Sequence, residues 1–445
     1  MKEPKEQPLH TRRQFLRTSV LGGALASTVP LFLEKTFLCL DTMAAATTGQ
    51  VTTGKDGTIL VVLQLAGGND GLNTLVPFGD DAYYKARPKI ALPAKEILRI
   101  SDYAGFHPKL SGLRSLYGEG CLGMVQGVGY PNPNRSHFRS TEIWQTASGS
   151  DQILSDGWLG RYFDNCCRGS DPATVGIAIG GQTPQAFASK SPMGVAFNNP
   201  DQFRYMKEAA NDPAAADQFM REINQPPSAE HSSLAENAGG SIGMLAGPAD
   251  MDGSTVEFLQ RTALDAQMSS DRILEITRKT KSTVNYPASQ LGNSLNLVGR
   301  LIAGGLPSRV YYVSQGGFDT HANQIPAHDR LMGDLDVALS AFVADLKAQG
   351  NLGRVLVLSF SEFGRRVAEN ASAGTDHGAA APLFVLGGGV KPGLYGAYPS
   401  LTDLHDGDLK FSTDFRSVYA TALERWLGVP SEVVLGKKYP LLPFI

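Results

Sequence analysis

Seven short apolar runs, each bordered by polar or glycine-rich loops, constrain the fold of this 445-residue chain more than any other feature. The first run, Thr58–Leu65, shows no alternation of apolar and polar residues, which is typical of a central strand buried on both faces. The other runs cover residues 121–128, 175–179, 194–197, 309–314, 354–360 and 383–386. Helix-like segments lie between several of them, and Leu331–Lys347 carries apolar residues at helical spacing. Strands that alternate with helices predict an α/β protein with a largely parallel sheet and helices on both faces.

The region from about Asp201 to Leu301 differs from the rest. It is polar and favours helix, with a Pro/Ser/Gly-rich stretch at 226–250 and a long amphipathic pattern over Glu257–Lys281. We interpret it as a mostly helical insertion (201–301) within one α/β domain that spans residues 58–445. An elongated crossover connection is the simpler alternative.

The N-terminus has the pattern of an export signal. Adjacent arginines, Arg12 and Arg13, stand before Phe15 and Leu16, and a weakly apolar run covers residues 18–33. Small residues at 42–46 offer a cleavage site. This order predicts a twin-arginine signal over residues 1–46 and a flexible lead-in over 47–57. The alternatives are an uncleaved membrane anchor and a surface helix with a chance Arg-Arg pair.

Export by this route predicts a periplasmic or secreted protein. Its partners would be the twin-arginine translocation machinery and a substrate, with membrane contact only during export. The chain has 40 basic against 43 acidic residues, so it lacks the basic excess that attracts nucleic acid. Four cysteines without a C-x-x-C pair argue against a disulfide scaffold and a thiolate metal site.

Metal-binding side chains cluster at the ends of the apolar runs. In open α/β sheets, ligands bind beyond the carboxyl ends of the strands. Carboxylates and imidazoles at these places predict a site for divalent metal ions (zinc, manganese or calcium), with the number of ions left open. The expected metal ligands are Asp70, Asp319, His321, Glu362, Asp376 and His377. Taken singly, each could instead be a loop residue, as Asp70 could be in its Asn-Asp-Gly turn.

Ser136 begins a helix-like segment after the second run. It is either a plain helix cap or a nucleophile at a helix N-terminus, where backbone N–H groups bind anions. Arg135 and Arg139 would then stabilise the oxygens of an anionic substrate. His137 follows Ser136 directly, and we expect it to point away from the site because adjacent helical residues diverge. We expect His107, a loop histidine before a proline, to be structural.

These motifs together resemble the exported bacterial domain-of-unknown-function 1501 family. The resemblance rests on residues 65–71 (LAGGNDG), 134–138 (NRSHF), 316–321 (GGFDTH), 361–365 (SEFGR) and 375–378 (TDHG). That family is grouped with the alkaline phosphatase and sulfatase superfamily. The resemblance implies a three-layer α/β/α sandwich. It also implies that Asp70, Asp319, His321, Glu362 and His377 bind metal, with Asp376 beside them, and that Ser136 is the nucleophile.

The leading hypothesis is therefore an exported metal-dependent hydrolase of phosphate or sulfate esters, acting on a small-molecule or glycan ester. Ser136, Arg135 and Arg139 would be its catalytic residues. The first alternative is a non-catalytic exported protein that binds an anionic glycan or an envelope component through the same cleft. A second is a twin-arginine oxidoreductase, which the absence of haem and flavin motifs argues against.

Overall fold

The computed structural model describes residues 57–167, 172–190, 194–200 and 270–445. The predicted export signal, nearly all of the lead-in and residues 201–269 of the predicted insertion lie outside the described residues. Within the described ranges, no helix has both the length and the apolar character needed to cross a membrane.

A nine-stranded mixed sheet forms the centre of the domain, in the order β11-β5-β10-β9-β1-β8-β6-β7, with β14 also paired to β5. Strand β1 (Ile59–Leu65) is buried along its whole length between the parallel strands β8 (Val310–Gln315) and β9 (Val355–Phe360). The remaining strands are β5 (Leu122–Gly129), β6 (Gly176–Ile179), β7 (Val195–Phe197), β10 (Ala381–Gly387), β11 (Gly393–Tyr395) and β14 (Thr413–Asp414).

Strand β10 is the antiparallel member of this sheet, and it pairs with both β5 and β9. The segment between β9 and β10 contains no helix, so the chain returns from the edge at which β9 ends instead of crossing over. Because β10 runs against both neighbours, β5 is parallel to β9. The carboxyl ends of β1, β5, β8 and β9 therefore lie at one edge of the sheet, and β10 starts there.

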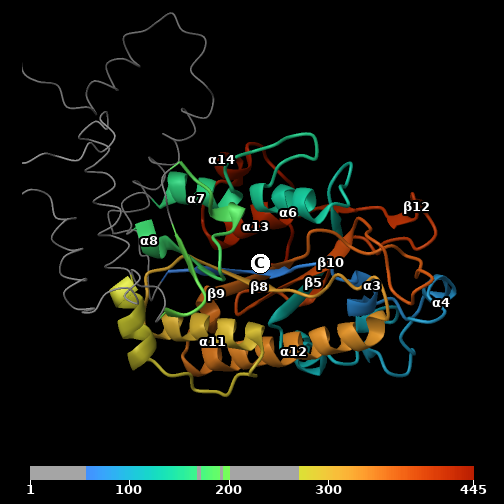
Figure 1. Ribbon diagram of the computed structural model, residues 1–445, viewed down its shortest axis with the longest axis horizontal. Coiled ribbons are helices and arrows are strands. Elements are labelled where there is room, and N and C mark those ends of the chain that lie inside the picture. The colour runs from blue at the N-terminus through green and yellow to red at the C-terminus, as the bar shows by residue number, and fades with distance from the viewer. Residues whose placement is uncertain (1–56, 168–171, 191–193, 201–269) are drawn as a thin grey trace, which may run out of the picture. The chain divides into compact units, whose positions relative to one another are not determined.

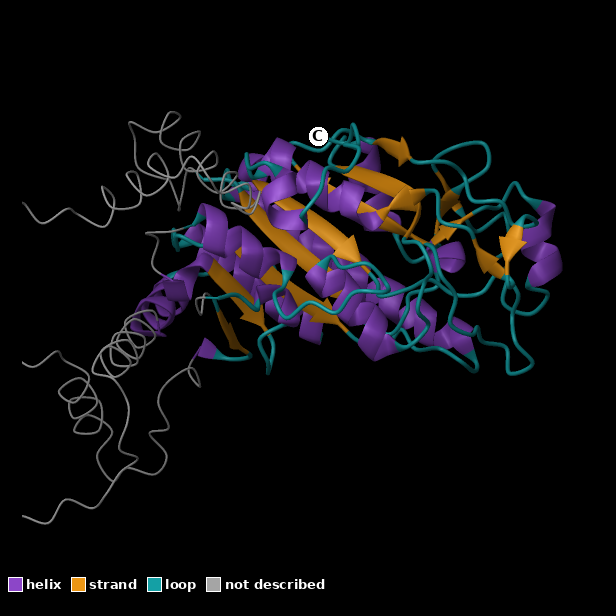
Figure 2. Cartoon of the chain, turned by 90° about the horizontal axis from the view of Figure 1, so that it is seen from above, coloured by secondary structure: helices purple, strands orange, loops and turns teal. Residues whose placement is uncertain are grey.

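Helices cover both faces of the sheet (Figure 1). On one face lie α11 (Gln290–Ala303) and α12 (Gln324–Ala348), which pack against each other, while α5 (Ser111–Gly118) packs on α12. On the other face lie α6 (His137–Thr146), α7 (Trp158–Cys166), α13 (Phe415–Thr421) and α14 (Ser431–Leu435). A π-helical turn, η5 (Ala422–Trp426), continues α13. These layers, seen from the side in Figure 1, confirm the predicted α/β/α sandwich, and the view from above in Figure 2 shows its helices overlapping the strands.

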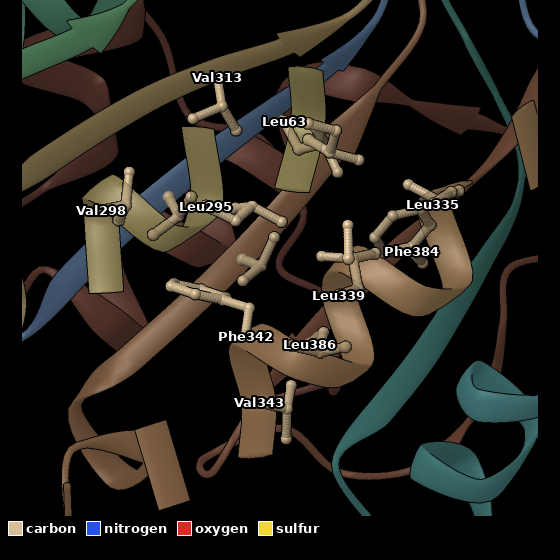
Figure 3. Packing of buried hydrophobic residues seen from close by; sticks show 14 of the residues in the cluster. Leu63, Leu295, Val298, Val313, Leu335, Leu339, Phe342, Val343, Phe384 and Leu386 are labelled. Carbon is tan, nitrogen blue, oxygen red and sulfur yellow. The ribbon is translucent and has the colours of Figure 1, made fainter. Parts of the chain in front are cut away.

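Apolar side chains fill the space between the sheet and the helices (Figure 3). On the α11/α12 face, Leu63 and Val313 from the strands meet Leu295 of α11 and Phe342 of α12. On the opposite face, the ring of Trp144 in α6 stacks on Phe360 of β9. Burial of apolar area on this scale is the main stabilising contribution to the fold.

Smaller elements surround the sandwich. A three-stranded sheet has the order β2-β4-β3, and β12 pairs with β13. The bounds are β2 Leu75–Val76, β3 Leu98–Arg99, β4 Gly105–Phe106, β12 Leu404–His405 and β13 Asp408–Leu409. The short helices are α3 Gly71–Thr74, α4 Asp81–Ala86, α8 Pro172–Val175, η1 Gln185–Phe187 and η4 Leu352–Arg354.

Candidate metal centre

Three histidines and one aspartate meet at the edge of the sheet where β1, β5, β8 and β9 end. His137 is the first residue of α6, Asp319 and His321 follow β8, and His377 precedes β10. Ligand atoms of His137, Asp319 and His377 all lie within 4.8 Å of one another. His321 Nε2 lies 3.0 Å from Asp319 Oδ1 and 2.9 Å from His377 Nε2. We call these four residues the histidine–aspartate cluster.

Spacing within the cluster suits a single bound ion. Asp319 Oδ1 lies 3.2 Å from His377 Nε2, and Asp319 Oδ2 lies 3.4 Å from His137 Nε2. Two nitrogens bound tetrahedrally to one zinc ion at about 2.0–2.1 Å are about 3.3 Å apart. The distances between neighbouring ligand atoms are therefore compatible with groups that share one metal ion.

Groups behind the histidines orient their ring nitrogens. The Nδ1 atom of His137 lies 2.8 Å from Glu362 Oε1, and that of His377 lies 2.8 Å from the carbonyl oxygen of Arg135. His321 Nδ1 lies 3.3 Å from Asp376 Oδ1. Ionised carboxylates and carbonyls only accept hydrogen bonds, so each Nδ1 donates in these contacts. With an ion in the cluster, each Nε2 lone pair would face that ion, in place of the hydrogen bond that His377 Nε2 makes to Asp319 Oδ1. Histidines held this way are typical metal ligands.

Arg365 fixes the carboxylate of the cluster. Its buried guanidinium donates from Nη2 to Asp319 Oδ1 over 2.7 Å. It also donates to the carbonyls of Gly68 at 2.7 Å and Thr375 at 2.8 Å, so it joins three of the loops that surround the cluster. Partial burial alone would raise the pKa of Asp319, but hydrogen bonds from Arg365 and His377 lower it to about 2. The Asp319 carboxylate is therefore ionised at physiological pH.

Close backbone packing holds the loop after β1 against the loop after β8. Gly67 has a φ of +118°, and a Cβ atom there would lie 2.5 Å from the backbone nitrogen of Asp319. Only glycine fits this approach. The Gly67 N–H donates to Glu362 Oε1 over 2.8 Å, which ties the same turn to the carboxylate behind His137.

Glu362 and Asp376, both predicted as metal ligands, lie behind the histidines. Glu362 is buried, with Oε1 accepting from Gly67 and His137, and Oε2 has no hydrogen-bond partner among the described residues. Asp376 contacts His321 and accepts from Asn370 Nδ2 over 3.1 Å. The structure thus brings these residues to the cluster as partners of its histidines.

Asp70, also predicted as a ligand, lies in a different set of contacts. Its Oδ2 accepts from Arg87 Nη1 over 2.6 Å, and both side chains are fully buried. Oδ1 accepts from the backbone of Leu72, which caps α3. Burial raises the pKa of Asp70, but Arg87 outweighs that effect and holds it below the ordinary value. None of its contacts in the described part of the chain is with the other predicted ligands.

The three predicted catalytic residues occupy the start of α6. Arg135 pairs with the buried Asp408, and Arg139 donates to the carbonyls of Gly149, Ser150 and Gln152. Both guanidiniums therefore already have partners. Ser136 is exposed at the N-cap position, and its side chain does not cap the helix.

The prediction that His137 points away from the site is wrong. The divergence of adjacent side chains applies within a regular helix, whereas Ser136 is extended, with φ −85° and ψ 128°, and His137 is the first helical residue. Sequence reasoning also missed Arg365. The signal available for His137 was its place in the NRSHF motif, which starts five residues after the end of β5.

His107 and His328 lie apart from the cluster and against each other, with ring centroids 5.4 Å apart. Burial lowers the pKa of His107 to about 4 and that of His328 to about 3, which keeps both rings neutral. The contacts of His107, including Asp329 Oδ1 at 3.0 Å from Nε2, fit the structural role that we expected for it.

Among solved structures, similar chains include sulfatases and phosphatases. The PsFucS1 sulfatase from Pseudoalteromonas sp. is 12% identical, with a TM-score of 0.35 over 91% of this chain and 74% of that chain. The alkaline phosphatase from the Antarctic bacterium TAB5 is 11% identical, with a TM-score of 0.32 over 76% and 95%. The C-terminal periplasmic domain of EcEptC from Escherichia coli, in complex with Zn, is 10% identical, with a TM-score of 0.32 over 76% and 74%. Similarities this low say nothing about the activity of this chain.

No curated protein matches the chain in sequence. A family model described as "Protein of unknown function (DUF1501)" matches residues 122–436, which is more than half of the chain. The match includes the segments 134–138, 316–321, 361–365 and 375–378 that carry the cluster and its supports. This chain therefore belongs to the DUF1501 family.

Proposed function

We propose that this protein is an exported, metal-dependent hydrolase of phosphate or sulfate esters. The observation that carries the proposal is the convergence of three imidazole Nε2 atoms and the ionised Asp319 carboxylate at the strand ends. The site is open, since the side chains of Asp319 and His321 are 47% and 44% exposed. A catalytic metal site keeps a coordination position for water or substrate, which a cluster of four ligands would supply through a fifth position or through release of one ligand.

The donor set indicates which ion suits the site. Three imidazole nitrogens and one carboxylate suit zinc or manganese, whereas calcium prefers six to eight oxygen ligands. The three carboxylates of Asp319, Glu362 and Asp376 outnumber the guanidiniums of Arg365 and Arg366, so the surroundings favour a dication. A bound ion of this kind polarises an ester oxygen and lowers the pKa of a hydroxyl or a water molecule.

In our proposal Ser136 is the nucleophile. The residue before it accepts a hydrogen bond from His377 through its carbonyl, and the residue after it is His137, so cluster contacts flank Ser136 on both sides. The first N–H groups of α6 have no intrahelical partner, and the side chain of the N-cap residue Ser136 does not cap them. Such a helix start favours the anionic oxygens of a phosphate or sulfate.

Oxygen recognition through Arg135 and Arg139 has less support. Arg135 would have to leave Asp408, and Arg139 would have to leave the carbonyls that it holds after α6. In our proposal the α6 backbone stabilises the substrate oxygens, and the two arginines hold the start of the helix in place.

The decisive experiment combines metal analysis with a substrate panel. The purified protein should bind zinc or manganese and hydrolyse an aryl phosphate, an aryl phosphodiester or an aryl sulfate. Ser136→Ala should abolish turnover while it leaves metal binding intact, and His377→Ala should reduce both. His405→Ala, which changes an exposed histidine of β12, is the matched control. Turnover by Ser136→Ala at the wild-type rate would show that Ser136 is not the nucleophile.

The openness of the site also supports a second candidate. A site with exposed ligands suits a long anionic glycan or an envelope component that is bound without turnover. Asp319→Ala should then weaken binding of a sulfated or phosphorylated glycan, while no ester on the panel is cleaved. Unchanged glycan affinity in that variant would exclude binding through this site.

The proposed location is the periplasm or the cell exterior, reached through the twin-arginine machinery. The support is the Arg12-Arg13 motif with the apolar run and small residues that follow it. Replacing Arg12 and Arg13 together by lysine should leave the protein in the cytoplasm, as cell fractionation would show. Normal export of that variant would point to another route.

A further inference from the structure

Gln324, at the start of α12, joins the two loops that carry most of the histidine–aspartate cluster. Its side chain is fully buried. The Oε1 atom accepts hydrogen bonds from Thr375 Oγ1 over 2.6 Å and from Thr320 Oγ1 over 3.1 Å. The Nε2 atom donates to Asp70 Oδ2.

The two threonines lie next to the residues of the metal site. Thr320 stands between Asp319 and His321, and Thr375 directly precedes Asp376 and His377. A backbone hydrogen bond of 3.3 Å from Thr375 N to Thr320 O also joins the two loops. The Oε1 atom of Gln324 therefore helps to fix the distance between His321 and His377. The Nε2 atoms of these two histidines are 2.9 Å apart.

Asp70 and Arg87 hold this amide in one orientation. Asp70 Oδ2 accepts from both Gln324 Nε2 and Arg87 Nη1. Arg87 also donates to the carbonyls of Arg366 and Val367, in the chain segment that leads from Glu362 to His377. Since an ionised carboxylate only accepts, the NH₂ group of Gln324 must face Asp70 and its oxygen must face the threonines.

We propose that Gln324 is a positioning residue for the metal centre and that the buried Asp70–Arg87 ion pair holds it in place. In this arrangement Asp70 supports the cluster through Gln324 without touching the ion. The inference rests on the metal site of the proposed function, and it adds Gln324 and Arg87, which no motif in the sequence singled out. Direct hydrogen-bond partners of metal ligands typically change metal affinity by about 10–100-fold when they are replaced, and Gln324 acts on His321 and His377 through the threonines next to them.

The variants that test this role remove hydrogen bonds at nearly constant volume. Gln324→Met removes all three bonds. Thr375→Val removes one, and Thr375→Ser should restore it. The matched control is Gln126→Met, because Gln126 is a buried glutamine of β5 that bonds to Tyr103 and has no contact with the cluster.

Two readouts separate positioning from general destabilisation. Gln324→Met should weaken zinc affinity about 10–100-fold and alter the visible spectrum of the Co²⁺-substituted protein. Thr375→Val should weaken zinc affinity about fivefold, as expected for one hydrogen bond, and Thr375→Ser should lie near wild type. Gln126→Met should leave zinc affinity and the spectrum unchanged, even if it lowers the melting temperature.

Hydrogen exchange on metal-free protein tests the link itself. Gln324→Met should accelerate amide exchange in residues 318–322 and 374–378 together, relative to Gln126→Met. Unchanged exchange in these segments would overturn the inference, as would wild-type zinc affinity in Gln324→Met. If the wild-type protein binds neither zinc nor manganese, the proposed function fails, while the exchange result still decides whether Gln324 joins the two loops.

Discussion

Arg365 donates a 2.7 Å hydrogen bond to the carboxylate of Asp319, from a side chain that is itself fully buried. The acceptor is 47% exposed, so this pair links the interior of the sandwich to the exposed histidine–aspartate cluster. The other bonds of Arg365, to Gly67, Gly68, Phe318 and Thr375, all go to backbone carbonyls of the surrounding loops. The placement of Asp319 thus depends on a buried arginine.

Replacing Arg365 by lysine should destabilise the protein by about 2–4 kcal/mol. The ammonium keeps the charge but cannot reach the carbonyls that the planar guanidinium satisfies, and these acceptors stay buried. Urea unfolding at neutral pH measures the difference. Arg366→Lys, at the half-exposed neighbouring arginine, is the control and should stay within about 0.5 kcal/mol of wild type. Equal stability of Arg365→Lys and wild type would contradict the role of the guanidinium.

Removing the charge of Asp319 should make the free energy of unfolding less dependent on pH in the acid range. The folded-state pKa is depressed to about 2 from an ordinary value of 3.8. The ionised carboxylate therefore stabilises the fold above pH 3.8, and this contribution is lost as the pH falls from about 4 to 2. Asp319→Asn should lose less stability than wild type over this range in metal-free unfolding curves. Asp403→Asn, at an exposed carboxylate, should follow the wild-type curve.

The buried Asp70–Arg87 pair should behave as a coupled unit. Arg87→Met leaves a buried carboxylate without its guanidinium and should cost about 3–5 kcal/mol. Asp70→Asn combined with Arg87→Met should cost clearly less than the sum of the two single changes. A double-mutant cycle by urea unfolding measures this coupling. Strict additivity would show that the two side chains do not stabilise each other.

Glu362→Gln should weaken metal binding without removing a ligand of the cluster. The amide oxygen can still accept from Gly67 and His137, but it lacks the negative charge that makes the His137 imidazole more basic. The expected loss of zinc affinity is about tenfold or more, measured by competition with a chromophoric chelator. Glu424→Gln, in η5, is the control. A variant that binds zinc as tightly as wild type would show that the charge of Glu362 does not act through His137.

The strands were predictable because they are buried on both faces. The runs 58–65, 121–128 and 354–360 correspond to β1, β5 and β9 within about one residue at each end. The direction of β10 was not predictable from its own residues, since an apolar run does not distinguish a parallel strand from an antiparallel one. Its direction follows from the short return after β9.

Several residues of the candidate site could be predicted from the sequence, but the contacts that hold them could not. Strand-end motifs gave Asp319, His321 and His377, because residues at the ends of parallel strands meet at one edge of a sheet. The pairing of Arg135 with Asp408, 273 residues apart, depends on tertiary packing that no local pattern carries. The same holds for the insertion of Arg365 between three loops.

The most direct test of the metal centre is a calorimetric zinc titration of the metal-free protein, run in parallel on His137→Ala, His377→Ala and His405→Ala. The predicted result is one ion per chain in wild type and in His405→Ala, with a loss of affinity of at least about a hundredfold in the other two variants. Equal zinc binding by all four proteins, or none by wild type, would contradict a metal centre at this cluster.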